Sequence, residues 1–291
     1  MSFISNLISG LSLGSIYALI ALGYTMVYGI AKMLNFAHGD IIMVGAFAVI
    51  TFVNTLGFPG IVGVFLSVVV CSLLGITIER IAYKPLRNAP SLSVLITAIG
   101  VSYFLEAAAQ LIFGVNQKSF PTILQTKAIH IGSLTVKGIS VVTMIVAVIL
   151  MVALTFFIKR TKMGKAMRAV SEDRAAAELM GISVNKTITI TFAIGSALAA
   201  VAGTFYGMTY TFITPYTGAM PGIKAFVAAV IGGVGSIPGA MLGGFLLGII
   251  ECLAKRYIST ALSDAIVFGV LILVLLVKPT GLLGKKKNEK V

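Results

Sequence analysis

Charged residues are scarce in this chain of 291 residues, where Asp, Glu, Lys and Arg together make up 11%, against about 25% in an average soluble domain. Hydrophobic residues make up 58%, and the mean hydropathy is +1.05. A soluble protein of this size cannot bury so much apolar surface. The composition therefore excludes a soluble enzyme, a disordered chain and a disulfide-stapled secreted module, and it predicts an all-α polytopic membrane protein.

The chain also lacks the residue clusters that catalysis or metal binding requires. Its two histidines, His38 and His130, fall on opposite predicted sides of the membrane, and its two cysteines, Cys71 and Cys252, lie far apart in apolar stretches. No GxSxG, HExxH or GxxxxGK[ST] motif occurs, and the glycines of 281–285 have the wrong spacing for a phosphate-binding loop. We therefore predict that the chain is not an enzyme and has no catalytic residue, metal site or cofactor of its own.

Long charge-free runs predict about eight or nine membrane segments. A helix needs about 20 apolar residues to span a bilayer, and glycine, proline and asparagine mark where the runs are cut. The expected segments are 5–30, 39–56, 60–79, 91–113, 138–158, 187–213, 222–235, 238–254 and 262–278. No stretch is left for an added soluble domain, so we expect residues 1–291 to form a single transmembrane domain. Since the N-terminus lacks a basic region and a clear cleavage site, we expect the first apolar run to remain as a span.

Basic residues predict the direction of the chain. The net charge is +13, from 22 Lys and Arg against 9 Asp and Glu, and in a membrane protein this excess is typical of cytoplasmic loops rather than of nucleic-acid binding. If the loop 159–186, the segment after residue 79 and the tail 279–291 face the cytoplasm, Lys32 and Lys278 join them, so that 16 basic residues lie inside and 6 outside. We therefore expect the N-terminus outside and the C-terminus inside.

The longest external loop is then predicted at 114–137. Apolar residues alternate with polar ones over 129–131 and 134–136, on either side of Gly132-Ser133. This pattern predicts a small β-hairpin in the loop.

The two short segments 222–235 and 238–254 are joined by glycines and Pro238. Glycine and proline favour irregular backbone, which is tolerated at membrane depth only inside protein or beside water. Two interpretations stay open: an interrupted pair that marks a transport pathway, or a plain tight helical hairpin. The predicted orientation requires both segments to cross, whereas a re-entrant hairpin would change the side of one terminus.

Ionisable residues inside predicted spans are few, and each is a functional candidate. Glu106 falls within the span 91–113, where it either takes part in transport or pairs with a buried residue such as a lysine. Asp40 begins a span beside His38, and Glu251 and Asp264 lie near span ends. We expect these three residues to be interfacial or helix-terminal. Because no relay of carboxylates and histidines crosses the spans, a proton-coupled carrier is disfavoured.

The loop 159–186 is the main polar segment. Alanine, glutamate, arginine and methionine favour a helix over 163–181, and Gly181 would end it. Small apolar residues at helical spacing give this helix one apolar face. Such a helix suits insertion into a groove of a partner, and an amphipathic linker or a helix lying on anionic lipid is the alternative.

Four motifs of this sequence, in order, resemble those of branched-chain amino acid ABC transporter permeases. They are Asn35-Phe36-Ala37-His38-Gly39-Asp40, Gly164-Lys165-Ala166-Met167-Arg168-Ala169 with Glu172-Asp173 and Ala177-Glu178-Leu179-Met180-Gly181-Ile182, then Lys224-Ala225-Phe226 with Gly232-Gly233-Val234-Gly235-Ser236-Ile237-Pro238-Gly239-Ala240, and Lys278-Pro279-Thr280-Gly281-Leu282-Leu283-Gly284. The last motif often has Arg before the proline, where this chain has Lys278. The resemblance runs from about residue 5 to residue 284 and is closest to the permease type of leucine, isoleucine and valine uptake.

The resemblance implies a subunit of an ATP-driven importer in the bacterial inner membrane. It implies a second related permease chain, two ABC ATPase subunits that hold ATP and Mg, and an external substrate-binding protein, with membrane lipid around the chain. The loop helix would couple to the ATPases through Gly164, Lys165, Arg168, Ala169, Glu172, Asp173, Ala177 and Gly181. The pathway candidates are Asn35, His38, Asp40, Glu106, Gly232, Gly233, Gly235, Ser236 and Pro238.

Other functions remain open at this point. Urea and short-amide permeases carry similar motifs and differ in cargo. A stand-alone gradient-driven carrier or channel is compatible with the interrupted segment at 232–239, and a membrane scaffold is compatible with the many glycines. The ordered motifs favour the importer subunit over the stand-alone carrier or channel and over the scaffold.

Overall fold

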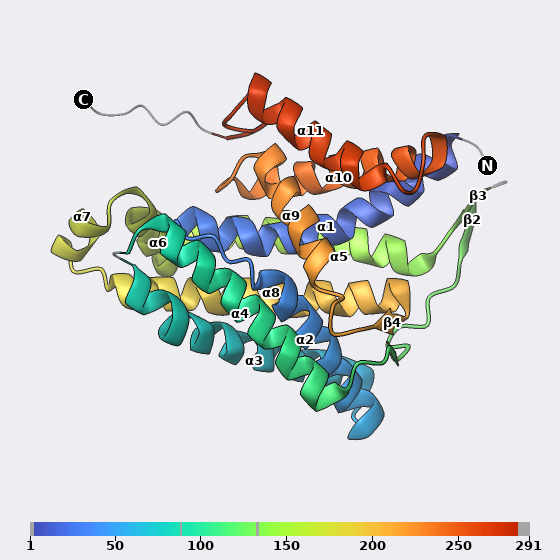
Figure 1. The fold of residues 1–291 in the computed structure, drawn as a ribbon, viewed down its shortest axis with the longest axis horizontal. Coiled ribbons are helices and arrows are strands. Elements are labelled where there is room, and N and C mark those ends of the chain that lie inside the picture. Colours follow the sequence, from blue (N-terminus) through green and yellow to red (C-terminus); the bar gives the residue numbers. More distant parts are fainter. Residues whose placement is uncertain (1–2, 88, 132–133, 285–291) are drawn as a thin grey trace.

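Nine apolar helices make up most of the part of the chain that the computed structural model describes, residues 3–87, 89–131 and 134–284 (Figure 1). Seven of them are long and apolar enough to cross a membrane, and two are shorter. The membrane helices are α1 (Phe3–Ala31), α2 (His38–Ile50), α3 (Gly60–Ile78), α4 (Ser91–Phe113), α5 (Gly138–Arg160), α8 (Val184–Tyr210), α9 (Ala219–Gly232), α10 (Ile237–Tyr257) and α11 (Ser263–Val277). The chain is therefore an all-α multi-pass membrane protein, as its composition predicts.

Short π-helical and 3₁₀ turns extend two of these helices. A π-turn over Thr51–Thr55 continues α2, while a π-turn over Glu79–Tyr83 and a 3₁₀ turn over Lys84–Leu86 continue α3. Every predicted segment matches one helix to within a few residues, because charge and proline end the apolar runs where the helices end.

The helices form an inner and an outer layer. In α1, α2 and α8, 67% of the most apolar window is buried, whereas only 17% is buried in α5 and 22% in α4. The outer helices expose large apolar side chains, including Phe65, Phe104 and Phe156. Apolar faces of this kind are stable against lipid, so the outer layer fits a bilayer and the inner layer holds the protein core.

Glycines let α1 and α10 cross at very short distance. A Cβ atom on Gly248 would meet the backbone of Gly14, and one on Gly244 would meet the backbone of Ala18. Between apolar helices in lipid, close backbone approach replaces the hydrophobic effect as the source of association. Gly10 and Gly14 in α1, and Gly244 and Gly248 in α10, are each four residues apart and lie at this crossing.

Replacing Gly248 with valine should lower the free energy of unfolding by about 3 kcal/mol, since the extra atoms overpack a backbone contact. Gly269→Val in α11 is the matched control, because a Cβ there has no neighbour within 4 Å. Thermal unfolding in detergent gives the melting temperature of each of the two variants. Equal melting temperatures for the two variants would contradict the assigned crossing.

Two of the helices begin inside the bundle rather than at its ends (Figure 1). After α1 the chain turns at Lys32, whose φ is 56°, and runs back without regular structure to the start of α2 at His38. The segment after α8 likewise enters the bundle before α9 begins at Ala219. The two starts touch, because Gly39 packs against Gly218 and Gly222. Irregular backbone at this depth is covered by neighbouring helices, as membrane chains require.

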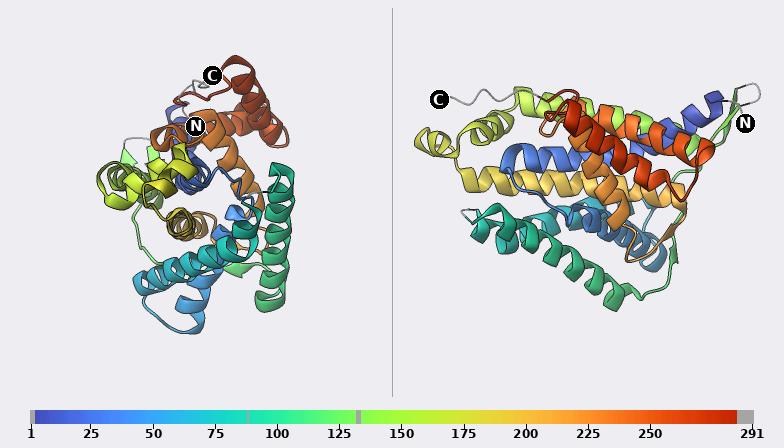
Figure 2. Two further views of the ribbon diagram at one scale, coloured as in Figure 1. Left: turned by 90° about the vertical axis from the view of Figure 1, so that its left-hand side faces the viewer. Right: turned by 45° about the horizontal axis from the view of Figure 1, so that its top comes forward.

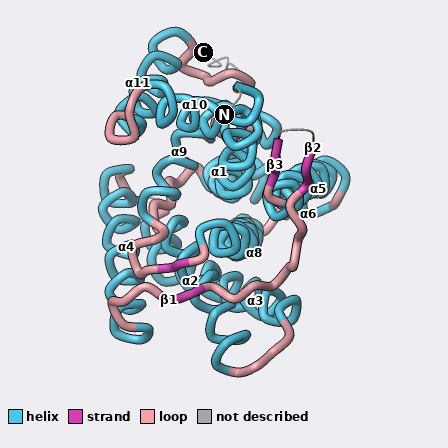
Figure 3. Tube along the Cα trace, turned by 90° about the vertical axis from the view of Figure 1, so that its right-hand side faces the viewer, coloured by secondary structure: helices cyan, strands magenta, loops and turns pink. Residues whose placement is uncertain are grey.

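The two ends of the bundle carry different features. Helices α6 (Lys162–Glu172) and α7 (Arg174–Leu179) project at one end, here called the α6–α7 end (Figure 2). The opposite end carries the predicted hairpin, in which β2 (Ile129–Ile131) pairs antiparallel with β3 (Leu134–Val136) (Figure 3). This end is called the hairpin end, and the expected turn residues 132–133 lie outside the described residues. A second short pair there joins β1 (Lys118–Ser119) to β4 (Phe212–Ile213).

Helix α9 covers only part of the length of the bundle, and α10 follows it in the opposite direction. Helix α9 runs from the interior to the α6–α7 end, α10 returns to the hairpin end, and α11 crosses again, so that α1 begins and α11 ends at opposite ends (Figure 1). Irregular chain before α9 supplies the length that its 14 residues lack.

The single helix predicted over 163–181 is wrong in one respect, because the chain breaks it into α6 and α7. Asp173 has extended backbone, with φ −150°, and its side chain accepts a hydrogen bond from the Ala176 backbone N–H. An aspartate in this role starts a new helix. The predicted stop is confirmed, since Gly181 has φ 78° just after α7.

Candidate transport pathway and coupling segment

The first group of pathway candidates meets in the interior, where α2 faces α4. Asp40, in the first turn of α2, is 1% exposed, and its carboxylate accepts a hydrogen bond from the Ser102 hydroxyl of α4. Its second oxygen, Oδ1, is buried without a hydrogen-bond partner among the described residues. Glu106, one helical turn beyond Ser102, is 8% exposed and lies within electrostatic range of Asp40. Two carboxylates thus share one small region of the bundle.

His38 and Asn35 lie beside this region and are held by packing. The His38 ring packs against Gly23, and its edge meets Tyr24 at 4.6 Å between ring centroids. Its Nε2 atom is buried and has no partner in the described part of the chain. The Asn35 side-chain oxygen accepts a hydrogen bond from the Tyr83 hydroxyl at 2.9 Å. Asn35 therefore fixes the irregular chain before α2 to the π-turn that continues α3.

The second group of candidates, 232–239, lies elsewhere, at the turn between α9 and α10. Gly232 packs against Gly239 across the turn, and Gly233, with φ 107°, packs against the chain after α11. Ser236 accepts a hydrogen bond from the Gly239 N–H at 3.2 Å and so caps α10, where Pro238 occupies the first turn. The structure therefore brings 35–40 and Glu106 together but separates them from 232–239.

An ion cluster that the sequence did not predict joins four helices near the hairpin end. Lys224 of α9 contacts Glu251 of α10 and Asp264 of α11, both at 2.7 Å. Glu251 also accepts hydrogen bonds from the Tyr17 hydroxyl at 2.8 Å and from Lys255 at 2.6 Å. Lys224 and Glu251 are nearly buried, with side chains 8% and 1% exposed. Glu251 is thus internal rather than interfacial, while Asp264, 41% exposed, keeps its expected place at a helix end.

One signal in the sequence pointed to this cluster. Lys224 is a lone cation in a short apolar segment, and an intramembrane lysine requires a partner. The partner lies 27 residues further along the chain, so sequence spacing does not identify it.

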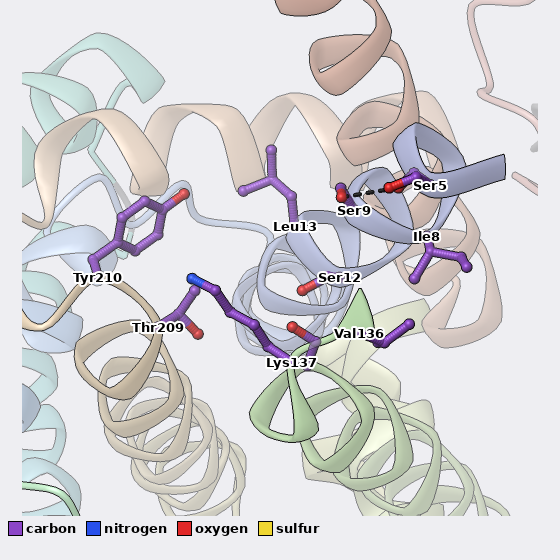
Figure 4. A pocket seen from close by; sticks show the side chains of 10 residues that line it. Ser5, Ile8, Ser9, Ser12, Leu13, Val136, Lys137, Thr209 and Tyr210 are labelled. Atoms are coloured by element: carbon purple, nitrogen blue, oxygen red, sulfur yellow. Dashed lines mark hydrogen bonds between the residues drawn. The ribbon is translucent and has the colours of Figure 1, made fainter. Parts of the chain in front are cut away.

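A cavity of about 410 Å³ opens at the hairpin end between α1, α5 and α8. The Lys137 ammonium points into it, towards Tyr210 and Thr209 (Figure 4). Serine hydroxyls of α1 and α5 and the apolar side chains of Ile8 and Leu13 complete its lining. A cavity that mixes one cation, hydroxyls and aliphatic carbon can contact both ends of a small zwitterion.

The predicted coupling residues divide into an inward and an outward set. Gly164 and Ala177 are buried and Ala169 is partly buried against the bundle. Lys165, Arg168, Glu172 and Asp173 are exposed. Beyond them, Leu179 and Met180 project their apolar side chains with 88% and 81% exposure. The segment therefore offers a charged face and an apolar tip away from the bundle.

The comparison with known families covers almost the whole chain. Residues 6–275 match the family described as branched-chain amino acid transport system / permease component. The chain belongs to this family. It is 45% identical to the high-affinity branched-chain amino acid transport system permease protein LivH of Escherichia coli and to BraD of Pseudomonas aeruginosa, with 99% of this chain and 98% of each relative covered. It is 30% identical to a probable LivH of Methanocaldococcus jannaschii, over 93% of this chain and 89% of that protein.

In this permease, Ser102→Ala should cost about 1–3 kcal/mol of unfolding free energy, because the buried Asp40 carboxylate would lose its one side-chain hydrogen bond within the described part of the chain. Ser72→Ala is the control, since the Ser72 hydroxyl donates to the Val68 carbonyl of its own helix and to no other group in the described chain. Thermal unfolding of both variants in one detergent measures the difference. If Ser102→Ala melts with the wild type, Ser102 is not the partner that Asp40 needs.

Proposed function

We propose that this chain is a membrane-spanning permease subunit of an ATP-driven ABC importer that moves leucine, isoleucine and valine into the cell. The observation that carries the proposal is the 45% identity to LivH and BraD over nearly the full length of both chains. In this proposal the partners are a second related permease, two ATPase subunits that hold ATP and Mg, and an external substrate-binding protein. Hydrolysis takes place on the ATPases, so this chain contributes the path and the coupling contact.

The proposal places the α6–α7 end in the cytoplasm of a bacterial cell and the hairpin end outside. Basic residues support this orientation, because Lys159 and Arg160 end α5 and further lysines and arginines follow in α6 and α7. Cytoplasmic loops carry such an excess. The N-terminus is then outside and the C-terminus inside.

The proposed path runs from the cavity at the hairpin end towards the touching starts of α2 and α9. The Lys137 ammonium suits the carboxylate of an arriving amino acid, and Ile8 and Leu13 suit its aliphatic side chain. In the interior, the unpaired Asp40 oxygen and Glu106 suit its ammonium group. A zwitterion needs such partners, because an unpaired charge in the membrane interior is costly. The turn 232–239 is proposed as the part that shifts when access changes side.

Movement is proposed to reach the path through α6 and α7. ATP-driven closure of the ATPases would push on the exposed tip at Leu179 and Met180, and the buried Gly164 and Ala177 would transmit the displacement to the bundle. A rigid connection of this kind is what gating by a partner requires.

Copurification of the tagged chain from its host in mild detergent tests the assembly. We expect mass spectrometry to identify a second permease and P-loop ATPases, and uptake by the reconstituted complex to depend on ATP and the binding protein. Uptake by the purified chain alone would establish a gradient-driven carrier or channel instead. Competition between leucine and urea for the binding protein separates the amino-acid importer from a urea or short-amide importer.

A further inference from the structure

A second cavity, of about 360 Å³, lies at the α6–α7 end, between the end of α1, the start of α4 and the start of α7. Lys32, Arg87 and Arg174 line it, and among the described residues no carboxylate does. These cations come from three segments that are distant in sequence, so only the fold brings them together. This cluster is called the basic cavity.

The two arginines of the basic cavity, Arg87 and Arg174, have few acidic partners among the described residues. Arg87 contacts Glu79 and also donates to the Asn185 side-chain oxygen, while its Nε is buried without a partner in the described chain. Arg174 donates to the backbone carbonyl of Ala31. Burial and the nearby Arg87 both lower the pKa of Arg174. Among the described residues, Glu79 is the acidic group that contacts one of these two arginines, and an anion in the cavity would relieve the repulsion between the two guanidinium groups.

The start of α4 adds uncharged donors to the same cavity. Ser91, the first residue of α4, lines it, and the residue before it is Pro90, which provides no side-chain cap. The Ser93 and Val94 N–H groups donate to the Pro90 carbonyl, whereas the N–H groups of Ser91 and Leu92 have no acceptor among the described residues. Helix starts and arginines are the two groups that proteins combine to bind phosphate.

The remaining wall of the basic cavity is apolar and leads towards the membrane. Met33, Leu34, Val94 and Leu95 line it beside Tyr28. The neighbouring face of α4 exposes Leu92 and Ile96 at 64% and 60%. A soluble phosphate would gain nothing from this wall, whereas the acyl chains of a lipid would lie along it.

We propose that the basic cavity binds the phosphate of an anionic phospholipid, with Lys32, Arg87 and Arg174 around the headgroup and the acyl chains against the exposed face of α4. The bound headgroup joins the end of α1, the start of α4 and the start of α7. It therefore steadies the coupling segment against the bundle, and its presence depends on the composition of the membrane.

Native mass spectrometry of the purified transporter, with phosphatidylglycerol or phosphatidylcholine added after delipidation, tests this. We expect retained phosphatidylglycerol and little phosphatidylcholine. Arg174→Gln and Lys32→Gln should each weaken retention about tenfold, the scale of one lost charge-assisted hydrogen bond, and Arg174→Lys should restore part of it. Lys186→Gln is the matched control, because Lys186 is an exposed cation near the start of α8 that does not line the cavity.

Equal losses in Arg174→Gln and Lys186→Gln would overturn the site in favour of general surface charge. Complete displacement of the lipid by excess inorganic phosphate would overturn the lipid assignment and leave phosphate alone as the ligand. Retention in the isolated chain that disappears once the ATPases bind would assign the cavity to an acidic group of the partner. The assay reads lipid and not transport, so it fails or succeeds independently of the proposed substrate.

Discussion

Glu251→Gln is expected to lower the free energy of unfolding by about 3–5 kcal/mol, the cost of breaking a buried ion pair on one side. The carboxylate of Glu251 accepts from Lys224, Lys255 and Tyr17 at once, and its side chain is 1% exposed. The variant would leave Lys224 buried with Asp264 as its remaining acidic partner. We expect a much lower melting temperature in detergent and a smaller folded fraction in size-exclusion chromatography.

Two further variants make this prediction specific. Asp264→Asn should cost less than about 1 kcal/mol, because Asp264 is 41% exposed and water can replace its contact with Lys224. Adding Lys224→Met to Glu251→Gln should recover part of the stability, since no uncompensated lysine stays buried. If the double variant is as unstable as the sum of its single changes, the two residues do not act as a pair.

Leu179→Asp is expected to reduce ATP-dependent uptake by about tenfold or more while leaving the protein folded. The side chain is 88% exposed, so the change costs the isolated chain little. An apolar tip that fills a groove of a partner is the type of contact whose loss weakens binding by 2 kcal/mol or more, on the order of thirtyfold. The loss of coupling is measured by ATP-dependent uptake in proteoliposomes and by the ATPase activity of the reconstituted complex.

Val115→Asp is the control for this variant, because Val115 is 63% exposed in the loop at the other end. Arg168→Asp tests the charged face of the same segment and should also reduce uptake. Normal uptake in both Leu179→Asp and Arg168→Asp, with unchanged expression, would remove α6 and α7 from the coupling role.

The order and bounds of the membrane helices followed from local sequence. Charge-free runs ended by proline, glycine or basic residues predicted 91–113 and 138–158, which the structure shows as Ser91–Phe113 and Gly138–Arg160. The hairpin around 132–133 and the helix stop at Gly181 were also local, since each depends on the conformations that a few neighbouring residues allow. The family resemblance was equally readable, because its motifs are short and ordered.

The site itself was only partly readable from the sequence. Asp40 and Glu106 were named as candidates because an ionisable residue is rare in an apolar run, but their shared location depends on how α2 packs against α4. Asp173 was named for coupling, and yet its cap divides the helix that propensity alone had predicted.

Tertiary structure alone decided which distant residues meet. Lys224 finds Glu251 and Asp264, and Lys32 finds Arg87 and Arg174, across separations that carry no periodic signal. Helix formation in an apolar medium is dictated by backbone hydrogen bonds within one segment, so the sequence by itself determined the spans. Pairing between helices depends on shape and on scattered polar contacts, whose energies appear only once the helices are packed.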